Sequence, residues 1–133
     1  MKVKGLDGRE HSWYLVGYQP SLSDERPRSD LHVQVRSTLK ELYVSHTILE
    51  EVPLPGIGLF GDFYLPQIKL MVEAHGRQHY EFVHFFHQDM VGFVKSKKRD
   101  AAKAAWCDIN KITLVICSYA ETKDVWKQRL IAS

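Results

Sequence analysis

One stretch of the sequence, IKLMVEA at residues 68–74, constrains the fold more than any other. It is almost continuously apolar, which is typical of a strand buried on both faces near the middle of a sheet. Residues 59–65, LFGDFYL, form a second strand-like run, and only Pro66 and Gln67 separate the two runs. Such a short link predicts an antiparallel hairpin, because parallel strands need a long crossover. The core is therefore expected to form around this hairpin.

Helical periodicity appears on both sides of the hairpin. Leu31, Val35 and Leu39 recur at helical spacing and predict a helix over about 30–46, with Ser29 or Asp30 as its cap. The Ala-rich, charged stretch 88–109 predicts a long helix. Asn110 is a typical residue at a helix end. We expect the apolar side of the long helix to consist of Val94, Ala101, Ala105, Trp106 and Ile109.

The remaining segments complete the predicted topology. Residues 111–118, KITLVICS, predict a third strand, and residues 121–131 predict a closing helix that buries Val125, Trp126 and Leu130. Residues 12–18 predict a short strand or a packed arm, and residues 19–29 a loop. The order of helix, hairpin, helix, strand and helix predicts an α/β sandwich with a mixed central sheet flanked by helices.

Length and composition indicate one globular domain. The 133 residues suffice for one core and are too few for two. We therefore expect a single domain over 1–133, with its core at about 30–119, an N-terminal arm at 1–29 and a C-terminal helix at 120–133. No apolar run reaches the roughly 18 residues of a membrane span, and the N-terminus lacks a signal-peptide core. A cytoplasmic protein without a membrane partner is the resulting expectation.

Positive charge is concentrated in one segment of the predicted long helix. The net charge is only +2, too small to indicate a polyanionic partner by itself. Between residues 95 and 103, however, five basic residues accompany a single acid, Asp100. This segment is either a phosphate-binding face or a solvated helix surface. The basic residues are Lys95, Lys97, Lys98, Arg99 and Lys103.

Each strand of the predicted hairpin carries one acid, Asp62 in the first and Glu73 in the second. The short turn makes the two carboxylates near neighbours. Two adjacent carboxylates repel each other and lose hydration unless a cation joins them. Mg²⁺ takes hard oxygen ligands and keeps waters for chemistry, so it is the expected ion. Alone, Asp62 could also be an ordinary exposed strand residue.

Polar residues follow the buried strand directly. His75 lies two residues after Glu73, so the two side chains share one face of a regular strand. His79 follows across Gly76, where the chain can bend. Imidazole titrates near neutral pH, and two histidines beside an acid indicate acid–base chemistry. Arg77 and Gln78 could bind phosphate or orient a substrate.

The segments FGDFYL, KLMVEAHGRQHY and KKRDAAKAAWCDINKITLVI together resemble the PD-(D/E)xK nuclease superfamily. The resemblance is closest to the branch of very-short-patch repair (Vsr-like) and phage homing endonucleases. It covers roughly residues 30–119 and implies a restriction-endonuclease-like three-layer sandwich. Its motifs are short, but they occur in the family's order and spacing.

The resemblance implies roles for individual residues. Asp62 would be the main metal ligand and Glu73 the second acidic position. His75 stands where the wider superfamily has lysine, so the chain departs from the lysine mechanism. His75 or His79 would instead activate water or protonate the leaving oxygen. Asp100 would match the helix acid that supports a histidine or a metal-bound water.

The resemblance also implies an acid in the first helix, for which Glu41 is the match and Glu50 and Glu51 are alternatives. Taken together, these features predict a metal-dependent DNA endonuclease that uses Mg²⁺ or Mn²⁺ and is encoded by a phage or mobile element. The alternatives are a junction resolvase or ribonuclease, or a DNA-binding protein that has lost activity. A homodimer or an accessory specificity factor is possible, because no appended recognition module is evident.

Overall fold

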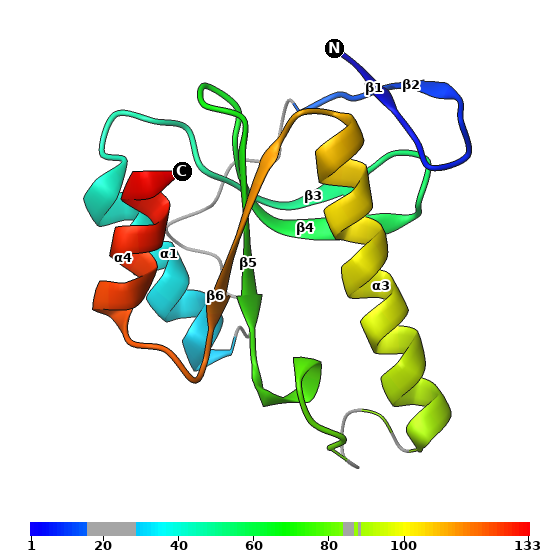
Figure 1. The fold of residues 1–133 in the computed structure, drawn as a ribbon. Helices are drawn as coiled ribbons and strands as arrows, with labels where there is room; N and C mark the ends of the chain where they lie inside the picture. Colours follow the sequence, from blue (N-terminus) through cyan, green and yellow to red (C-terminus); the bar gives the residue numbers. More distant parts are fainter. Residues whose placement is uncertain (16–28, 84–86, 88) are drawn as a thin grey trace.

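The computed structural model describes residues 1–15, 29–83, 87 and 89–133 (Figure 1). A small N-terminal hairpin consists of β1 (Lys2–Lys4) and β2 (Glu10–Ser12). The main sheet contains β3 (Leu49–Leu54), β4 (Leu59–Leu65), β5 (Leu70–His75) and β6 (Thr113–Ser118). The helices are α1 (Asp30–Leu42), the short 3-10 helix η1 (Arg77–His79), α3 (Met90–Ile109) and α4 (Lys123–Ala132).

The main sheet is mixed, as the sequence predicted. Its strand order is β3-β4-β5-β6. β4 and β5 form the expected antiparallel hairpin, with Phe63 opposite Val72 and Leu65 opposite Leu70. β6 pairs with β5 in parallel, and the chain between them runs through α3. β5 is therefore an interior strand, and its three apolar residues from Leu70 to Val72 are all buried.

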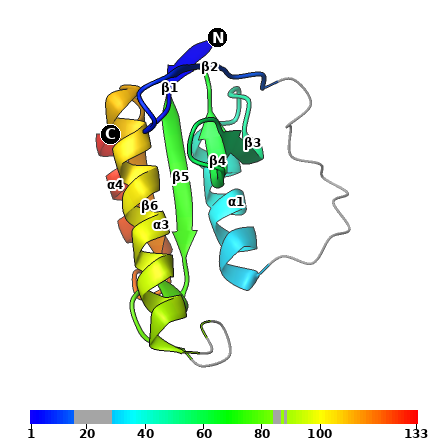
Figure 2. The same cartoon turned by 90° about the vertical axis from the view of Figure 1, so that its right-hand side faces the viewer.

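Helices cover both faces of this sheet. α1 and α4 lie on one side and α3 on the other (Figures 1 and 2). Val72 and Leu70 pack into the core beneath α1 and α4, together with Trp126 of α4. Met71, which points to the other face, packs with Trp106 of α3. The alternation of side chains along β5 therefore supplies two cores, one on each face of the sheet.

The predicted apolar side of α3 is largely wrong. Trp106 is fully buried, but Val94, Ala101, Ala105 and Ile109 are exposed. The helix instead turns a partly polar stripe toward β5 and η1, formed by Ser96, Asp100, Lys103 and Cys107 with Phe93. The reason is that only the last turns of α3 cover the apolar core, whereas its first turns lie against polar side chains. In α4, Trp126 and Leu130 are buried as expected, but Val125 is not.

The predicted helix signals are confirmed, with shorter elements. Ser29 caps α1 by accepting a hydrogen bond from the amide of His32, and α1 ends at Leu42, earlier than expected. Asn110 caps the end of α3. Most of the predicted arm and loop over 12–29 and the expected first residue of the long helix, Gln88, lie outside the described residues.

β3 was not predicted, because prolines in this segment indicated a break. β3 is an edge strand, where a proline that lacks an amide donor is tolerated, and Pro53 pairs with Phe60. The register of the β3–β4 ladder passes from Glu50 opposite Phe63 to Val52 opposite Gly61, so Glu51 and Asp62 fall in the row between these two pairs. Glu51 has a left-handed backbone, with φ of 51°. Backbone of this kind is strained for a residue with a side chain.

Candidate active site at the end of the central strand

The two hairpin carboxylates come together where β4 and β5 separate. The last backbone pair of this ladder is Phe63 with Val72, and the next row would place Asp62 opposite Glu73. In this row, hydrogen bonds from backbone amides to carboxylate side chains replace the backbone-to-backbone hydrogen bonds of the ladder. The Asp62 amide donates to Glu73 Oε2 over 2.6 Å, and the Ala74 amide donates to Asp62 Oδ2 over 2.8 Å. The predicted proximity of the two acids is confirmed, and two reciprocal hydrogen bonds hold them in place.

Lys103 joins this pair from the facing helix. Its Nζ donates to Glu73 Oε1 over 2.7 Å, so both Glu73 oxygens are hydrogen-bonded. Glu73 is only 2% exposed. Its burial, together with the nearby charge of Asp62, raises the pKa of Glu73 to about 7 despite the opposing effect of Lys103. Asp62 Oδ1 makes no hydrogen bond within the described residues, so one carboxylate oxygen of the pair is available to a cation.

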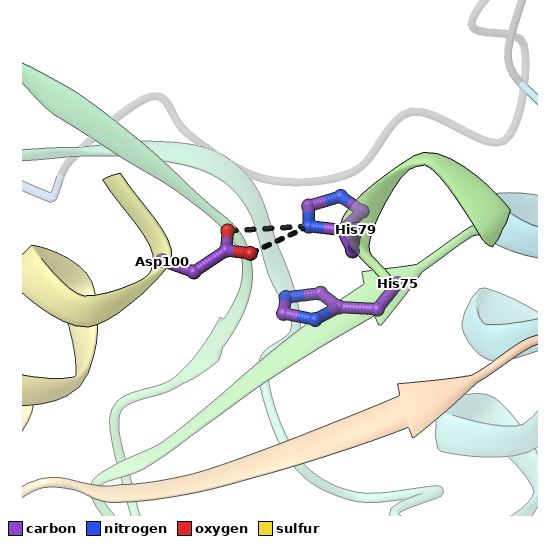
Figure 3. Close-up of side chains that lie close together, drawn as sticks. All are labelled: His75, His79 and Asp100. Carbon is purple, nitrogen blue, oxygen red and sulfur yellow. Dashed lines mark hydrogen bonds and ion pairs between the residues drawn. The ribbon is translucent and has the colours of Figure 1, made fainter. Parts of the chain in front are cut away.

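A second cluster lies at the end of β5 and combines His75, His79 and Asp100 (Figure 3). His75 ends β5, His79 lies on η1 and Asp100 lies on α3. His79 Nδ1 is 3.0 Å from Asp100 Oδ2. This bond favours the tautomer that carries its proton on Nδ1, which leaves Nε2 free to accept a proton. The 3-10 turn that follows Gly76, in which the His79 amide donates to the Gly76 carbonyl, brings His79 back over His75.

The two imidazoles are stacked, with ring centroids 3.9 Å apart and planes within 10°. His75 is 4% exposed, and its burial and the nearby His79 lower its pKa to about 4. Neither ring nitrogen of His75 makes a hydrogen bond to any residue that the structure describes. For Asp100, burial acts against ionisation, but the hydrogen bond from His79 and the surrounding positive charges prevail and lower its pKa. At neutral pH, the cluster therefore contains a neutral His75 beside an ionised Asp100.

The stripe on α3 connects the two clusters. Asp100 and Lys103 are three residues apart on one side of the helix, so one reaches the histidines and the other reaches Glu73. The positive charge of Lys103 also acts on both His75 and Asp100. The arrangement thus places an oriented imidazole on the same side of the sheet as an ammonium group and a carboxylate pair, of which Glu73 is buried.

The basic residues of α3 do not form one surface around Asp100. Lys97 and Lys103 lie on the same side of the helix as Asp100, whereas Lys95 and Lys98 fall on other sides of the helix. Lys97 Nζ lies 5.1 Å from the centre of the Tyr80 ring. Lys95, Lys98 and Arg99 are exposed, and Lys103 is partly buried in its ion pair rather than free on the surface.

The two other predicted phosphate-binding residues lie on η1. Arg77 is exposed and forms an ion pair with Glu81, in which its Nε lies 2.7 Å from Oε2. Gln78 is half-buried. An exposed ion pair of this kind contributes little to stability and is readily exchanged for another partner. Arg77 therefore remains accessible to an anion.

The structure corrects the prediction for Glu41. Glu41 lies on α1 and forms ion pairs with Lys123 and Lys127 of α4, on the side of the sheet opposite α3. Of its two alternatives, Glu50 is bound by His32 and Arg36 of α1, with His32 Nε2 2.6 Å from Glu50 Oε1. Glu51 alone lies in the same row of the sheet as Asp62 and Glu73.

Sequence reasoning missed the pairing of Lys103 with Glu73 and the position of Tyr80 beside the histidines. The Tyr80 ring centre lies 6.1 Å from that of His75 and, on its other side, 6.1 Å from that of Tyr119. One available signal was the spacing of Lys103, three residues after Asp100 on a helix. No pattern in the sequence indicated Tyr80, because its neighbours come from distant segments.

The raised pKa of Glu73 leads to a testable pH dependence. In the unfolded chain, Glu73 loses its proton at its ordinary pKa of 4.5, whereas in the folded protein it keeps the proton up to a pKa of about 7. The stabilisation is therefore complete below pH 4.5 and is lost as pH rises through 7, a change on the order of 3 kcal/mol. The lowered pKa of His75 acts in the opposite direction, so the relevant quantity is the difference between wild type and Glu73→Gln.

Urea unfolding of both proteins between pH 4.5 and 7.5 measures this difference. With rising pH, we expect the wild type to lose stability relative to Glu73→Gln. Parallel stability curves for the two proteins would show that Glu73 titrates normally.

Comparisons with known proteins identify viral relatives. The chain is 39% identical over 64 residues to "Uncharacterized protein 307L" of Invertebrate iridescent virus 6, a match that covers 48% of this chain and 32% of that protein. It is 36% identical over 67 residues to "Uncharacterized protein 033L" of Invertebrate iridescent virus 3, covering 50% of this chain and 34% of that protein. The matches thus span about a third of the length of these curated relatives.

No protein-family model matches the chain, and no solved structure matches it. Among the described helices, none combines the length and apolar character that a membrane span requires.

Proposed function

We propose that this chain is a metal-dependent endonuclease with a restriction-endonuclease-like fold, related to the Vsr-like branch, and that DNA is its substrate. The observation that carries the proposal is the pairing of His79 with Asp100 beside the group formed by the buried Glu73 with Asp62 and Lys103. Hydrolysis of a phosphodiester needs an activated water, stabilisation of charge at phosphorus and protonation of the leaving oxygen. His79 matches the first need, and Lys103 together with an ion held by Asp62 and Glu73 would match the second.

His79 is the proposed proton-transfer residue. Asp100 accepts its Nδ1 proton and orients the ring, so Nε2 is free to take a proton from water. His79 is partly exposed, which gives water and substrate access. The neutral, buried His75 packs against the ring and limits its movement. His79 is therefore the general base, and His75 is a positioning residue.

Asp62 and Glu73 are the residues that would hold Mg²⁺, with Mn²⁺ as a substitute. The donor set suits a hard cation, because Asp62 Oδ1 is available and the buried Glu73 lacks full compensation for its negative charge. A bound ion would stabilise the negative charge that develops on the phosphate. Lys103 contributes one fixed positive charge beside Glu73.

Lys97 and Arg77 are the basic residues proposed to hold the DNA backbone close to His79, with Gln78 and Arg99 extending the contact. Lys95 and Lys98 lie on other sides of α3, so they would contact only more distant phosphates. Lys97→Ala is expected to weaken DNA binding at all sequences and to reduce the slope of log K against log salt by about 1. The measurement is fluorescence anisotropy of a labelled duplex at several salt concentrations. Lys40→Ala is the matched control, because Lys40 lies on α1 across the sheet. An equal loss of DNA affinity in both variants would show that α3 is not part of the DNA interface.

The matches to iridescent virus proteins support a viral or mobile-element origin within this proposal. A nuclease acting in an infected cell needs no membrane span. Recognition of a specific DNA site would then come from a second copy or an accessory factor.

A supercoiled-plasmid assay tests the proposal. We expect Mg²⁺ or Mn²⁺ to support conversion to open-circle or linear DNA, EDTA to prevent it, and Asp62→Ala to abolish it in a folded protein. Cleavage that survives Asp62→Ala would remove the catalytic assignment. Cleavage confined to a four-way junction or to RNA would identify the substrate as the branched or ribonucleic alternative. Failure to cut any of these in any metal would leave a DNA-binding protein.

A further inference from the structure

The cluster of His75, His79 and Asp100 has the composition of a transition-metal site. Two imidazole nitrogens and one carboxylate oxygen form a ligand set typical of Zn²⁺, with a fourth position open to water. One potential ligand atom from each of these residues lies within 4.8 Å of the others. In a tetrahedral zinc site, neighbouring ligand atoms are roughly 3.3 Å apart. Rotation of these side chains, with a tilt of the two stacked imidazoles so that their lone pairs converge, would close the cluster around an ion.

His75 is the buried member of the cluster. The residue is 4% exposed, and its ring stacks against that of His79 with centroids 3.9 Å apart. Its position at the end of β5 fixes where the imidazole lies relative to η1 and α3. The His79 ring lies parallel to the His75 ring, and its Nδ1 edge faces Asp100 (Figure 3). A metal ion bound by these groups would join β5, η1 and α3 at one point.

We propose that His75, His79 and Asp100 form a site for a single Zn²⁺-class ion, distinct from the Asp62–Glu73 pair. The softer imidazole ligands favour Zn²⁺ or Co²⁺, whereas the carboxylate pair favours Mg²⁺. Burial favours the neutral form of imidazole, which is the form that binds a metal. The positive charges of Lys97 and Lys103 disfavour a bound cation at this cluster. The ion pair of Lys103 with Glu73 offsets part of this repulsion. The inference goes beyond the proposed function, because metal binding does not require DNA cleavage.

Metal titration of the full chain without a polyhistidine tag tests the site. We expect Co²⁺ to produce the visible absorption of a four-coordinate ion, to saturate at one equivalent and to be displaced by Zn²⁺. His79→Ala and Asp100→Asn should each weaken binding by more than about 10- to 100-fold, the loss typical when only a residue that supports a metal ligand is removed. Both residues are partly exposed, so these variants are expected to fold; His75→Ala is the more drastic third variant.

His11→Ala is the matched control. His11 also lies 3.0 Å from an aspartate, Asp7, but in the N-terminal hairpin and without a third ligand. One-equivalent binding that His11→Ala retains and the cluster variants lose supports the site. Absence of saturable binding, or equal binding by all variants, overturns it.

The consequence for cleavage rests on the proposed function. Zn²⁺ would occupy His79 Nδ1 and Asp100, so the base would lose its orientation and Mg²⁺-dependent cleavage should stop at one bound Zn²⁺. Full cleavage by the zinc-loaded protein would overturn this inhibitory role. Metal binding without any cleavage would refute the proposed nuclease function but support the Zn²⁺ site. Cleavage without Co²⁺ or Zn²⁺ binding would support the nuclease function but refute the Zn²⁺ site.

Discussion

Replacing His79 by alanine is expected to reduce DNA cleavage by about 10²- to 10⁴-fold, the usual contribution of a general base. The reason is geometric: Asp100 holds His79 Nδ1 at 3.0 Å, and the opposite nitrogen is left to accept a proton. The side chain is partly exposed and outside both apolar cores, so its loss should leave the melting temperature nearly unchanged. Single-turnover cleavage at saturating Mg²⁺ gives the rate, and circular dichroism gives the stability.

Two further variants make this result specific to the pair. Asp100→Asn keeps the shape of the side chain but removes the charge that stabilises the protonated imidazole, so it should also slow cleavage and alter the pH–rate profile. His11→Ala, which breaks an equivalent His–Asp contact elsewhere, should cleave as the wild type does. A His79→Ala protein that retains more than half of the activity would remove His79 from the mechanism.

The largest expected effect on stability is that of Trp106→Ala. Trp106 is fully buried, packs edge-on against Trp13 with ring centroids 5.1 Å apart, and donates from Nε1 to the carbonyl of Pro55 over 2.9 Å. It joins α3 to β4 and β5 through Tyr64 and Met71, in the core on the α3 face. Truncation of such a side chain costs about 3–5 kcal/mol in unfolding free energy. Since α3 carries Asp100 and Lys103, the active-site geometry should also suffer.

Urea unfolding measures the loss. Trp106→Phe is the matched variant, because it retains most of the packing and loses the hydrogen bond to Pro55, so it should be destabilised by a smaller amount. Ile109→Ala, at an exposed position in the same turn of α3, should change stability little. A loss below about 1 kcal/mol for Trp106→Ala would show that the core on the α3 face does not depend on this side chain.

The elements that the sequence predicted well have strong local signals. The apolar run that became β5 and the Ser29 cap of α1 each depend on neighbouring residues only. The turn before β5 is longer than the two residues predicted, because Leu65 pairs with Leu70 and residues 66–69 form the turn. The predicted buried side of α3 failed, because helical periodicity cannot show which part of a long helix meets an apolar layer. β3 was missed for a related reason: whether a proline can be accommodated depends on the strand lying at an edge.

In the candidate site, too, some features were predictable from the sequence and others were not. Asp62 and Glu73 were expected to be neighbours, because a short hairpin turn fixes their register, and His75 shares a face with Glu73 through the two-residue period of a strand. The sequence by itself thus determined the central hairpin and the residues on it that can carry chemistry. Only the tertiary structure decided which helix meets them. The crossover through α3 brings Asp100 to His79 and Lys103 to Glu73, across 21 and 30 residues of sequence, and leaves Glu41 on the opposite layer. Contacts of that range depend on how helices dock on the sheet, which no local pattern encodes.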